Sequence, residues 1–431
     1  MQGVIDFLVQ VLQQTSILIG LIALIGFIAQ KKPVGATIAG TIKTTLGVII
    51  MGAGANVVVG SVTPLGDLTQ AGFNLQGALP VNEVFVALAQ QKLGNQISLV
   101  FAISFLLSIL IARFTPLKYV FLSGHHIIFM STLTVGLLGL TVFKDSPVML
   151  IIVASVISAI SYVISPWLSA PFMEKVIGSK DFVMGHFGNP SYVLAGWLGQ
   201  YVGDPKDSSE KIKFPEWIGF MKEPLVAMAF VMWIIYMIAS VAAVIATGTE
   251  NVGTIFGNAN SWIINSLLQG LTFAAGIGII LLGVRMILAD IVPAFRGFAE
   301  KIVPNAVPAL DCPVVFPYAQ NAVLIGYLGS IVGGVLVLIA QVASNGALGA
   351  VIIPSMIIHF FLGATSGVFG NATGGWKGAL MGGFISGFIF TLLAGTAYPA
   401  LGQLGFSNST FGDTGFGVVG NYLALVNSFF Q

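Results

Sequence analysis

Hydrophobic residues occur along this chain in long runs that are separated by short polar segments. Runs such as TSILIGLIALIGFIA and LVAMAFVMWIIYMIASVAAVIA approach the roughly 20 apolar residues that a helix needs to cross a bilayer. The alternation expected of membrane-barrel strands is absent, and a backbone inside hydrocarbon must satisfy its own hydrogen bonds. The pattern therefore predicts an all-α, polytopic membrane protein.

About eleven transmembrane helices are expected, in one membrane-embedded domain that covers residues 1–431. The first run lacks the basic start and the cleavage site of a signal peptide, so it is expected to persist as a helix. The spans are predicted near residues 5–29, 37–62, 96–113, 119–142, 147–170, 224–248, 260–289, 322–343, 347–363, 376–398 and 414–430.

The composition agrees with a membrane location. The chain is 56% hydrophobic and 8% charged, whereas a soluble domain carries roughly 25% charged residues. A net charge of +1 argues against a nucleic-acid partner. Cys312 is the only cysteine, which excludes an internal disulfide and a cysteine-based metal cluster. The 53 glycines permit close helix contacts and irregular backbone inside the membrane.

Basic residues predict the orientation of the chain. Fifteen of them fall in or near odd-numbered loops and two, Lys92 and Lys144, in even-numbered loops. Because cytoplasmic loops carry the excess of Lys and Arg, the N-terminus is expected outside and the C-terminus in the cytoplasm. The fifteen are Lys31, Lys32, Lys43, Arg113, Lys118, Lys175, Lys180, Lys206, Lys211, Lys213, Lys222, Arg285, Arg296, Lys301 and Lys377.

One long polar connection, residues 174–223, falls on the expected cytoplasmic side. Its segment GDPKDSSEK is typical of a plain loop. The preceding segment, residues 181–203, is half apolar and rich in glycine, which suits a re-entrant hairpin as well as a loop.

A weak internal repeat is found when the chain is shifted by 231 residues. GVIIMG (47–52) then meets GIILLG (278–283), and ALPVNEVF (78–85) meets ALDCPVVF (309–316). In the same register HHIIFM meets MIIHFF. The matching spans are five apart, so the repeats, roughly 37–145 and 268–376, are expected to be inverted. Inverted repeats place a substrate near the midplane, between broken helices.

Six ionisable residues fall where the membrane is expected. Burying a charge there costs roughly 2.5–3.5 kcal/mol on insertion scales, so such residues usually line a polar cavity. Asp311 lies among prolines that break any helix around it, and Glu83 is close to its repeat counterpart. Both carboxylates are candidate ligand contacts, with a structural role as the alternative. The six are Glu83, His125, His126, His186, Asp311 and His359.

The histidines are not equivalent. His125 and His126 follow Gly124 at a helix start, and adjacent residues on a helix point about 100° apart. One of them, His125 by preference, is expected to face a ligand, while the other bonds a neighbour. His186 lies at the tip of the candidate hairpin, and His359 is expected to be a packed core residue.

Motifs for a cofactor, a metal ion or covalent chemistry are lacking. The sequence contains no phosphate-binding P-loop, no H-E-x-x-H and no G-x-S-x-G. Cys312 has no cationic sequence neighbour that would lower the pKa of its thiol, so a structural role is expected. No cofactor and no metal site is predicted.

Several segments together resemble one family. LSGHHIIFM, GTIKTTLGVIIMGAG, GGWKGAL and above all residues 283–330 are similar to the membrane subunit IIC of the bacterial ascorbate-type phosphotransferase system, in the ascorbate–galactitol superfamily. The resemblance implies an eleven-helix homodimer with a dimerisation domain and a core domain that moves by an elevator step. It implies a sugar that is phosphorylated on import by a separate cytoplasmic phospho-IIB protein, which IIA charges. The phosphoryl donor would thus be on another chain.

The family's substrate-contacting residues map onto His125, His186 and Asp311, with His126 beside them. Asn82 and Glu83 stand where the ascorbate subunit has Thr-Tyr, and Phe129 and Phe187 replace two glutamines. Ascorbate is an anion that Glu83 would repel, and lost amides leave hydroxyls unpaired at about 1–3 kcal/mol each. The substrate is therefore L-ascorbate, or a neutral sugar or polyol for which Glu83 or Asp311 is the candidate base.

Two other classes of protein fit the same pattern without the family motifs. Inverted repeats, broken spans and buried acids also occur in ion-coupled secondary transporters and channels. A sugar sensor without transport is a further alternative, although the sequence shows no output domain.

Overall fold

The structure is a computed structural model, and it describes residues 15–74, 77–139, 143–213, 219–220, 223–257, 261–402, 404 and 409–428. Parts of the predicted spans 5–29, 119–142, 260–289 and 414–430 lie outside these ranges, as do Lys222 and part of the connection 174–223.

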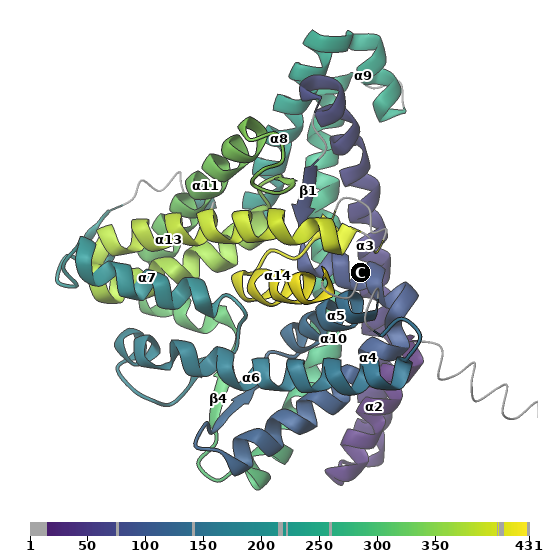
Figure 1. Cartoon of the computed structure of the whole chain (residues 1–431), viewed down its shortest axis with the longest axis vertical. Coiled ribbons are helices and arrows are strands. Elements are labelled where there is room, and N and C mark those ends of the chain that lie inside the picture. The colour runs from purple at the N-terminus through teal and green to yellow at the C-terminus, as the bar shows by residue number, and fades with distance from the viewer. Residues whose placement is uncertain are drawn as a thin grey trace, which may run out of the picture.

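Helices make up most of the described chain (Figure 1). The α-helices are α2 (Thr15–Ala29), α3 (Val34–Phe73), α4 (Asn82–Phe114), α5 (Gly124–Gly139), α6 (Pro147–Ile177), α7 (Asn189–Val202), α8 (Pro224–Thr247), α9 (Thr249–Phe256), α10 (Trp262–Ile302), α11 (Gln320–Ala343), α12 (Met356–Ile358), α13 (Ala364–Gly402) and α14 (Thr414–Ser428). The short 3₁₀ helices are η1 (Ser209–Lys211) and η3 (Cys312–Tyr318), and η4 (His359–Gly363) is a short π-helix.

Seven helical stretches among the described residues are long and apolar enough to cross a membrane. Three more predicted spans correspond to the shorter helices α2, α5 and α14, which have 15, 16 and 15 described residues. The predicted span 376–398 and residues 356–363 of the predicted span 347–363 fall together in one helical run, Met356–Gly402, whereas residues 347–355 precede it. The polytopic, helical class is thus confirmed. The prediction reaches eleven helices because it counts the three shorter helices as spans and divides the run Met356–Gly402 into two.

The run Met356–Gly402 bends where the hydropathy pattern divides it. Gly374 (φ −141°, ψ 16°) and Gly375 (φ 60°, ψ −152°) leave the helical conformation. The positive φ of Gly375 is a conformation that residues with a side chain rarely adopt. Since these two glycines precede residue 376, the sequence pattern registers a kink as a boundary between two helices.

Glycines set how closely the longest helices approach. On α3 and α10, Gly47 and Gly283 face each other: a Cβ built at Gly47 would lie 2.7 Å from Gly283 O, and one at Gly283 would lie 2.5 Å from Gly47 O. These contacts leave no room for a side chain, so the backbones touch directly, as small residues permit in membrane helices. Both glycines belong to the segments that the 231-residue shift brings together.

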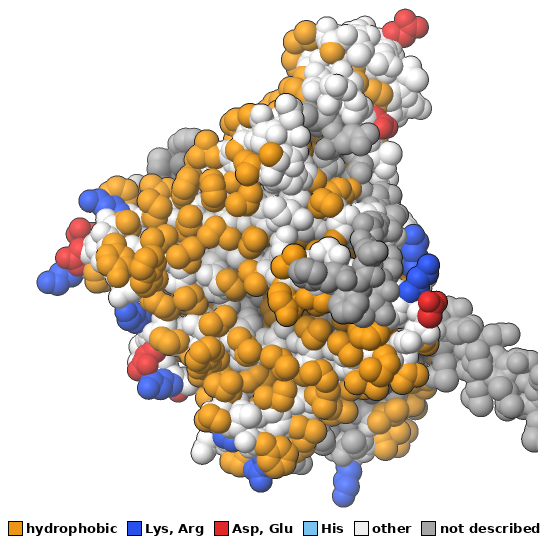
Figure 2. Space-filling model, viewed as in Figure 1, with side chains coloured by type: hydrophobic (Ala, Val, Ile, Leu, Met, Phe, Trp, Pro, Cys, Tyr) orange, Lys and Arg blue, Asp and Glu red, His pale blue; other side chains and the backbone are white. Residues whose placement is uncertain are grey.

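Three groups of helices pack around the centre of the molecule. α3, α8 and α10 form one group, α7, α11 and α13 a second, and α4, α5 and α6 a third. Figure 1 shows α8 and α9 extending the first group beyond the rest of the fold. In Figure 2 hydrophobic side chains cover most of the visible face, whereas Lys, Arg, Asp and Glu gather at its edges. Exposed Ile160 on α6 and Leu425 on α14 belong to this apolar exterior.

In the part of the chain that the structure describes, six short strands form two parallel three-stranded sheets among the helices, in the orders β5-β1-β6 and β2-β4-β3. In each sheet the middle strand comes from one half of the chain and both outer strands come from the other half. The strands are β1 (Gly77–Pro80), β2 (Tyr119–Phe121), β3 (Val183–Met184), β4 (Val307–Leu310), β5 (Val351–Ile352) and β6 (Ser409–Thr410).

The two sheets also share a register. Val120 pairs with Pro308 and Phe121 with Ala309 in one sheet. Gly77 pairs with Val351 and Ala78 with Ile352 in the other. Adding 231 to the residues of β2, and subtracting 231 from those of β4, converts the first two pairs into the second two.

Candidate functional site

A polar cavity of about 260 Å³ lies at the junctions where the six strands lead into helices. Because strands in a parallel sheet end at the same edge, each sheet brings three such junctions together. The volume lies near the lower end of small-molecule pockets, roughly 300–1,000 Å³. The lining residues are Asn82, Glu83, His125, His126, Phe129, His186, Leu281, Arg285, Asp311, Cys312, Pro313, Ile357, Ile358, Phe361 and Asp413.

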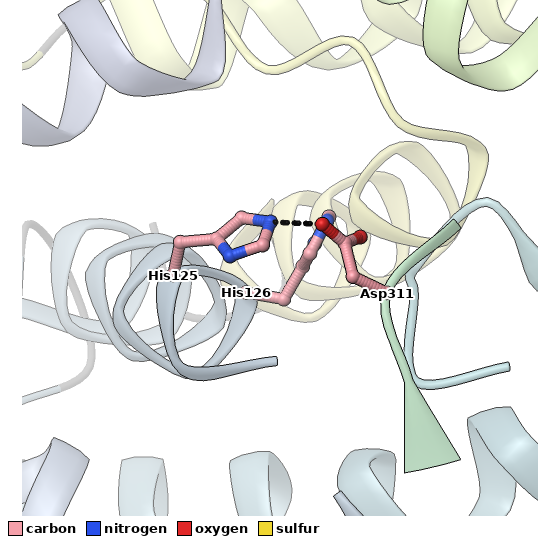
Figure 3. Close-up of side chains that lie close together, drawn as sticks. All are labelled: His125, His126 and Asp311. Carbon is pink, nitrogen blue, oxygen red and sulfur yellow. Dashed lines mark ion pairs between the residues drawn. The ribbon is translucent and has the colours of Figure 1, made fainter. Parts of the chain in front are cut away.

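Asp311 lies between two histidines of this cavity. His125 Nε2 is 3.5 Å from Asp311 Oδ2 (Figure 3), and His186 Nε2 is 4.0 Å from Asp311 Oδ1. Asp311 follows β4 and caps the next turn, because its Oδ1 accepts a hydrogen bond from the Cys312 N–H at 2.8 Å. The side chains of His125 and Asp311 are 18% and 36% exposed, so both reach the open part of the cavity.

The proton of His186 is placed by its neighbours. The Gly188 N–H donates to His186 Nδ1 at 2.9 Å, and the Tyr192 hydroxyl lies 2.9 Å from the same nitrogen. In the neutral ring Nδ1 is then the acceptor, and the hydrogen is on Nε2, which faces Asp311. The loop is held by Ser165, whose hydroxyl donates to the His186 carbonyl at 2.9 Å. His186 is thus a fixed donor.

His126 lies close to a different carboxylate, that of Asp413. Its Nδ1 lies 3.5 Å from Asp413 Oδ2, and both side chains are nearly inaccessible. Asn82 holds Asp413 by donating to Oδ2 at 3.1 Å, and accepts from the Gly412 N–H at 2.9 Å. The ring of His126 packs between those of His125 and His186, with centroids 4.4 and 4.0 Å away. Three imidazoles and two aspartates therefore form one cluster.

The charge of the lining is unbalanced. Glu83, Asp311 and Asp413 contribute three carboxyl groups, and Arg285, which is exposed, is the only Lys or Arg among the described lining residues. Glu83 is buried, and its Oε2 has no hydrogen-bond partner in the structure. An unpaired buried carboxyl oxygen is costly unless a proton, a cation or a ligand hydroxyl meets it.

The two phenylalanines that replace glutamines have different places. Phe129 lines the cavity and packs edge-on against the rings of His125 and His126. Phe187 is not among the lining residues: its ring packs against Phe121 and Phe416 behind the imidazoles. Of the predicted site residues, only Phe187 lies outside the lining set.

The remaining histidine has the packed position expected of it, and the cysteine lies beside Asp311. His359 is fully buried away from the cavity, where its Nδ1 bonds the Ser330 hydroxyl at 2.8 Å and its ring packs on Phe390. Cys312 is buried at the cavity wall.

Asp413 was missed by the sequence reasoning, although a signal for it exists. Gly412–Gly415, GDTG, leads from β6 into the start of α14, much as Gly185–Gly188, GHFG, leads from β3 to α7. Asp413 thus has the position of His186 in the other half of the chain. The shift between these segments is 227 residues, so a search fixed at 231 does not find it.

The cavity offers hydrogen-bond chemistry suited to a small polar ligand. Imidazoles donate and accept, and carboxylates accept from hydroxyl groups. The fold and this cavity together define a polytopic membrane protein with a cavity of hydrogen-bonding groups among its helices.

Comparison with known proteins gives the family. Residues 10–415 match the model of the sugar-specific permease component of the phosphotransferase system, EIIC-GAT. The chain belongs to this family of membrane permeases. An ascorbate-specific EIIC component of the same system from Mycoplasma pneumoniae (strain ATCC 29342 / M129 / Subtype 1) is 26% identical over 424 residues. The match covers 88% of this chain and 64% of the length of that relative.

Proposed function

We propose that the chain imports L-ascorbate or a related sugar, and that the cavity at the six junctions is the sugar site. One observation carries this proposal: His125, His126, His186, Asp311 and Asp413, from distant segments, converge on a single cavity. The proposed partner of this permease is a cytoplasmic phospho-IIB protein that phosphorylates the imported sugar. The deprotonating group would be Asp311 or Glu83, the two candidate bases.

The direct test is ligand binding by the purified chain in detergent. Ascorbate, neutral pentoses, hexoses and polyols are titrated separately while thermal unfolding is recorded. A sugar that raises the unfolding temperature in the unaltered chain, but not in the Asp311→Asn variant, supports the site. Failure of every sugar to bind, or equal binding by the variant, contradicts it.

A neutral sugar or polyol is the second candidate substrate. Three carboxyl groups face one exposed guanidinium in the lining, an arrangement that repels an anion such as ascorbate. Phe129 offers no hydrogen bond where a glutamine would. The ascorbate-specific relative favours the first candidate, and the charge of the cavity favours the second.

Transport would follow an elevator step of a core domain against a dimerisation domain in a homodimer. Inverted repeats of roughly 37–145 and 268–376 are proposed as its basis, because such repeats place a site between two halves that move. The exchange of outer strands between the sheets supports the repeats, as does their shared register. The test compares two cross-links. One between α3 and α10, which belong to the same group of helices, should leave uptake unchanged. One between α4 and α13, which belong to different groups, should stop uptake if these groups move against each other.

We propose an outside N-terminus and a cytoplasmic C-terminus, with the connection 174–223 on the side of the IIB partner. In the structure this connection is anchored: Glu210 Oε1 accepts from the Asn321 N–H at 2.8 Å at the start of α11. Asn321 Nδ2 in turn donates to the Ile212 carbonyl at 2.8 Å. Labelling of a single cysteine placed at Lys206 from either side of the membrane tests the orientation.

The energy dependence of uptake distinguishes group translocation from an ion-coupled secondary transporter. Uptake by vesicles that contain the IIA and IIB proteins should require phosphoenolpyruvate and persist with an uncoupler. Uptake that stops with the uncoupler and ignores phosphoenolpyruvate would contradict group translocation.

A further inference from the structure

Three side chains in the cavity have the arrangement of metal ligands. One nitrogen each of His125 and His126 and one oxygen of Asp311 lie within 4.8 Å of one another. His125 Nε2 and Asp311 Oδ2 are 3.5 Å apart (Figure 3). Ligands bound tetrahedrally to zinc at about 2.0–2.1 Å lie roughly 3.4 Å from each other. Small side-chain movements would therefore bring all three atoms to one ion.

The outer partners of these side chains also suit a metal. Metal-bound histidines usually donate their second ring nitrogen to a carboxylate, which fixes the ring. In His126, Nδ1 lies 3.5 Å from Asp413 Oδ2 without forming a hydrogen bond, so a small closing movement would give this arrangement, and Asn82 Nδ2 holds that oxygen at 3.1 Å. Nε2 of His126 is left for the ion. The second oxygen of Asp311 is likewise engaged by the Cys312 N–H.

His186 is placed to support the ion rather than to bind it. Its Nδ1 already accepts hydrogen bonds, so the neutral ring has its hydrogen on Nε2 and no free lone pair there. That N–H faces Asp311 Oδ1 at 4.0 Å. A donor close to the carboxylate oxygen that does not bind the ion, which here also accepts from the Cys312 N–H, helps to orient the carboxylate.

An independent observation supports a cation site. Glu83 is 8% exposed, lines the same cavity, and has an Oε2 without a hydrogen-bond partner. With Asp311 and Asp413 it makes three carboxyl groups against the single exposed Arg285 of the lining. A divalent cation would balance this surplus.

We propose that His125, His126 and Asp311 bind a divalent transition-metal ion of the Zn²⁺ type. Two imidazoles and one carboxylate leave positions open, and the exposure of His125 and Asp311 turns these positions toward the cavity. Neighbouring hydroxyl oxygens of a sugar could occupy them. Imidazole ligands favour Zn²⁺ over Mg²⁺, which prefers oxygen. Such an ion would also allow an anionic sugar to enter an otherwise acidic cavity.

The test measures metal content without any sugar, so it is independent of the proposed transport function. Tag-free, full-length protein in detergent is stripped with a chelator, desalted and dialysed against Zn²⁺ or Mg²⁺, and bound metal is measured by mass spectrometry. One Zn²⁺ per chain is expected, with Mg²⁺ binding at least tenfold more weakly. A rise in unfolding temperature with Zn²⁺ gives a second readout.

Variants of matched shape locate the ion. Asp311→Asn and His126→Gln should abolish stoichiometric binding, whereas Asp413→Asn, which removes an outer partner, should weaken it about 10–100-fold. His359→Gln, at a buried histidine outside the cavity, should bind Zn²⁺ like the unaltered chain. No zinc above the detergent blank, or equal binding in Asp311→Asn and His359→Gln, would overturn the proposal. If His126→Gln does not fold, the isosteric Asp311→Asn and Asp413→Asn variants decide.

Discussion

Asn82 holds the loop of Asp413 with both ends of its amide. Its Nδ2 donates to Asp413 Oδ2 at 3.1 Å, and its Oδ1 accepts from the Gly412 N–H at 2.9 Å. Asn82 starts α4, and Asp413 directly precedes α14. One side chain therefore links the two halves of the chain at the cavity.

Asn82→Ala should therefore weaken both stability and sugar binding. Leaving the Asp413 carboxylate and the Gly412 N–H unpaired costs about 1–3 kcal/mol for each buried group. Thermal unfolding and ligand titration check this. Asn421→Ala is the matched control, because that amide makes two hydrogen bonds, to Leu393 and Gly417, away from the cavity. It should lower stability alone; a loss of affinity in both variants would contradict a local role for Asn82.

Asp311→Asn is expected to abolish sugar binding while the protein remains monodisperse in detergent. The change keeps the shape of the side chain but removes the charge between His125 and His186. Isothermal titration with the sugar identified by the thermal screen measures the effect. Asp181→Asn, at an exposed carboxylate, serves as control. Unchanged affinity in Asp311→Asn would remove this residue from the sugar site.

His186→Ala should lower sugar affinity at least tenfold, since it removes a donor whose hydrogen position is fixed by Gly188 and Tyr192. His359→Ala removes an equally buried imidazole that bonds Ser330. It should destabilise the fold without changing affinity. Equal affinities in the two variants would show that His186 acts only on assembly.

Glu83→Gln should improve binding of ascorbate relative to neutral sugars. Two like charges about 6 Å apart repel by roughly 3 kcal/mol at an effective dielectric constant near 20. Even a fraction of this corresponds to a several-fold gain in affinity. Competition between ascorbate and a neutral polyol measures the ratio. If the ratio does not move, the Glu83 carboxyl is either uncharged or remote from the ligand.

Gly283→Val should prevent the close packing of α3 and α10, because the added Cβ would meet the Gly47 carbonyl oxygen at 2.5 Å. Overpacking of this kind costs about 1–3 kcal/mol or more. Its counterpart after the 231-residue shift, Gly52, has no atom within 4 Å of a built Cβ. Gly52→Val should be tolerated, and yields from membranes compare the two. Similar yields would mean that this contact is not needed for folding.

Hydropathy alone predicted the class of the protein, because burial in lipid constrains every helix in the same way. It divided Met356–Gly402 at the Gly374–Gly375 kink and did not reveal the six strands, which have two to four residues each. Strands this short leave no periodic pattern. Their pairing joins residues more than 120 positions apart, such as Val183 and Ala309.

The scarcity of ionisable residues in the apolar runs pointed to most residues of the candidate site. Glu83, Asp311 and the paired histidines stood out because ionisable groups are rare in apolar runs, and the structure brings them to one cavity. Asp413 was not predicted because it lies beside a polar turn, where an aspartate is common. Phe187 was placed by resemblance, but its contact with Phe416 depends on how α14 folds back, which no local pattern specifies.

The strand exchange has a consequence for biosynthesis. While the ribosome is still translating the second half, β1 has neither neighbour, because these are supplied only by residues 351–352 and 409–410. The lining of the cavity is complete only after Asp413 has been synthesised, so a chain that stops earlier lacks one of its carboxyl groups.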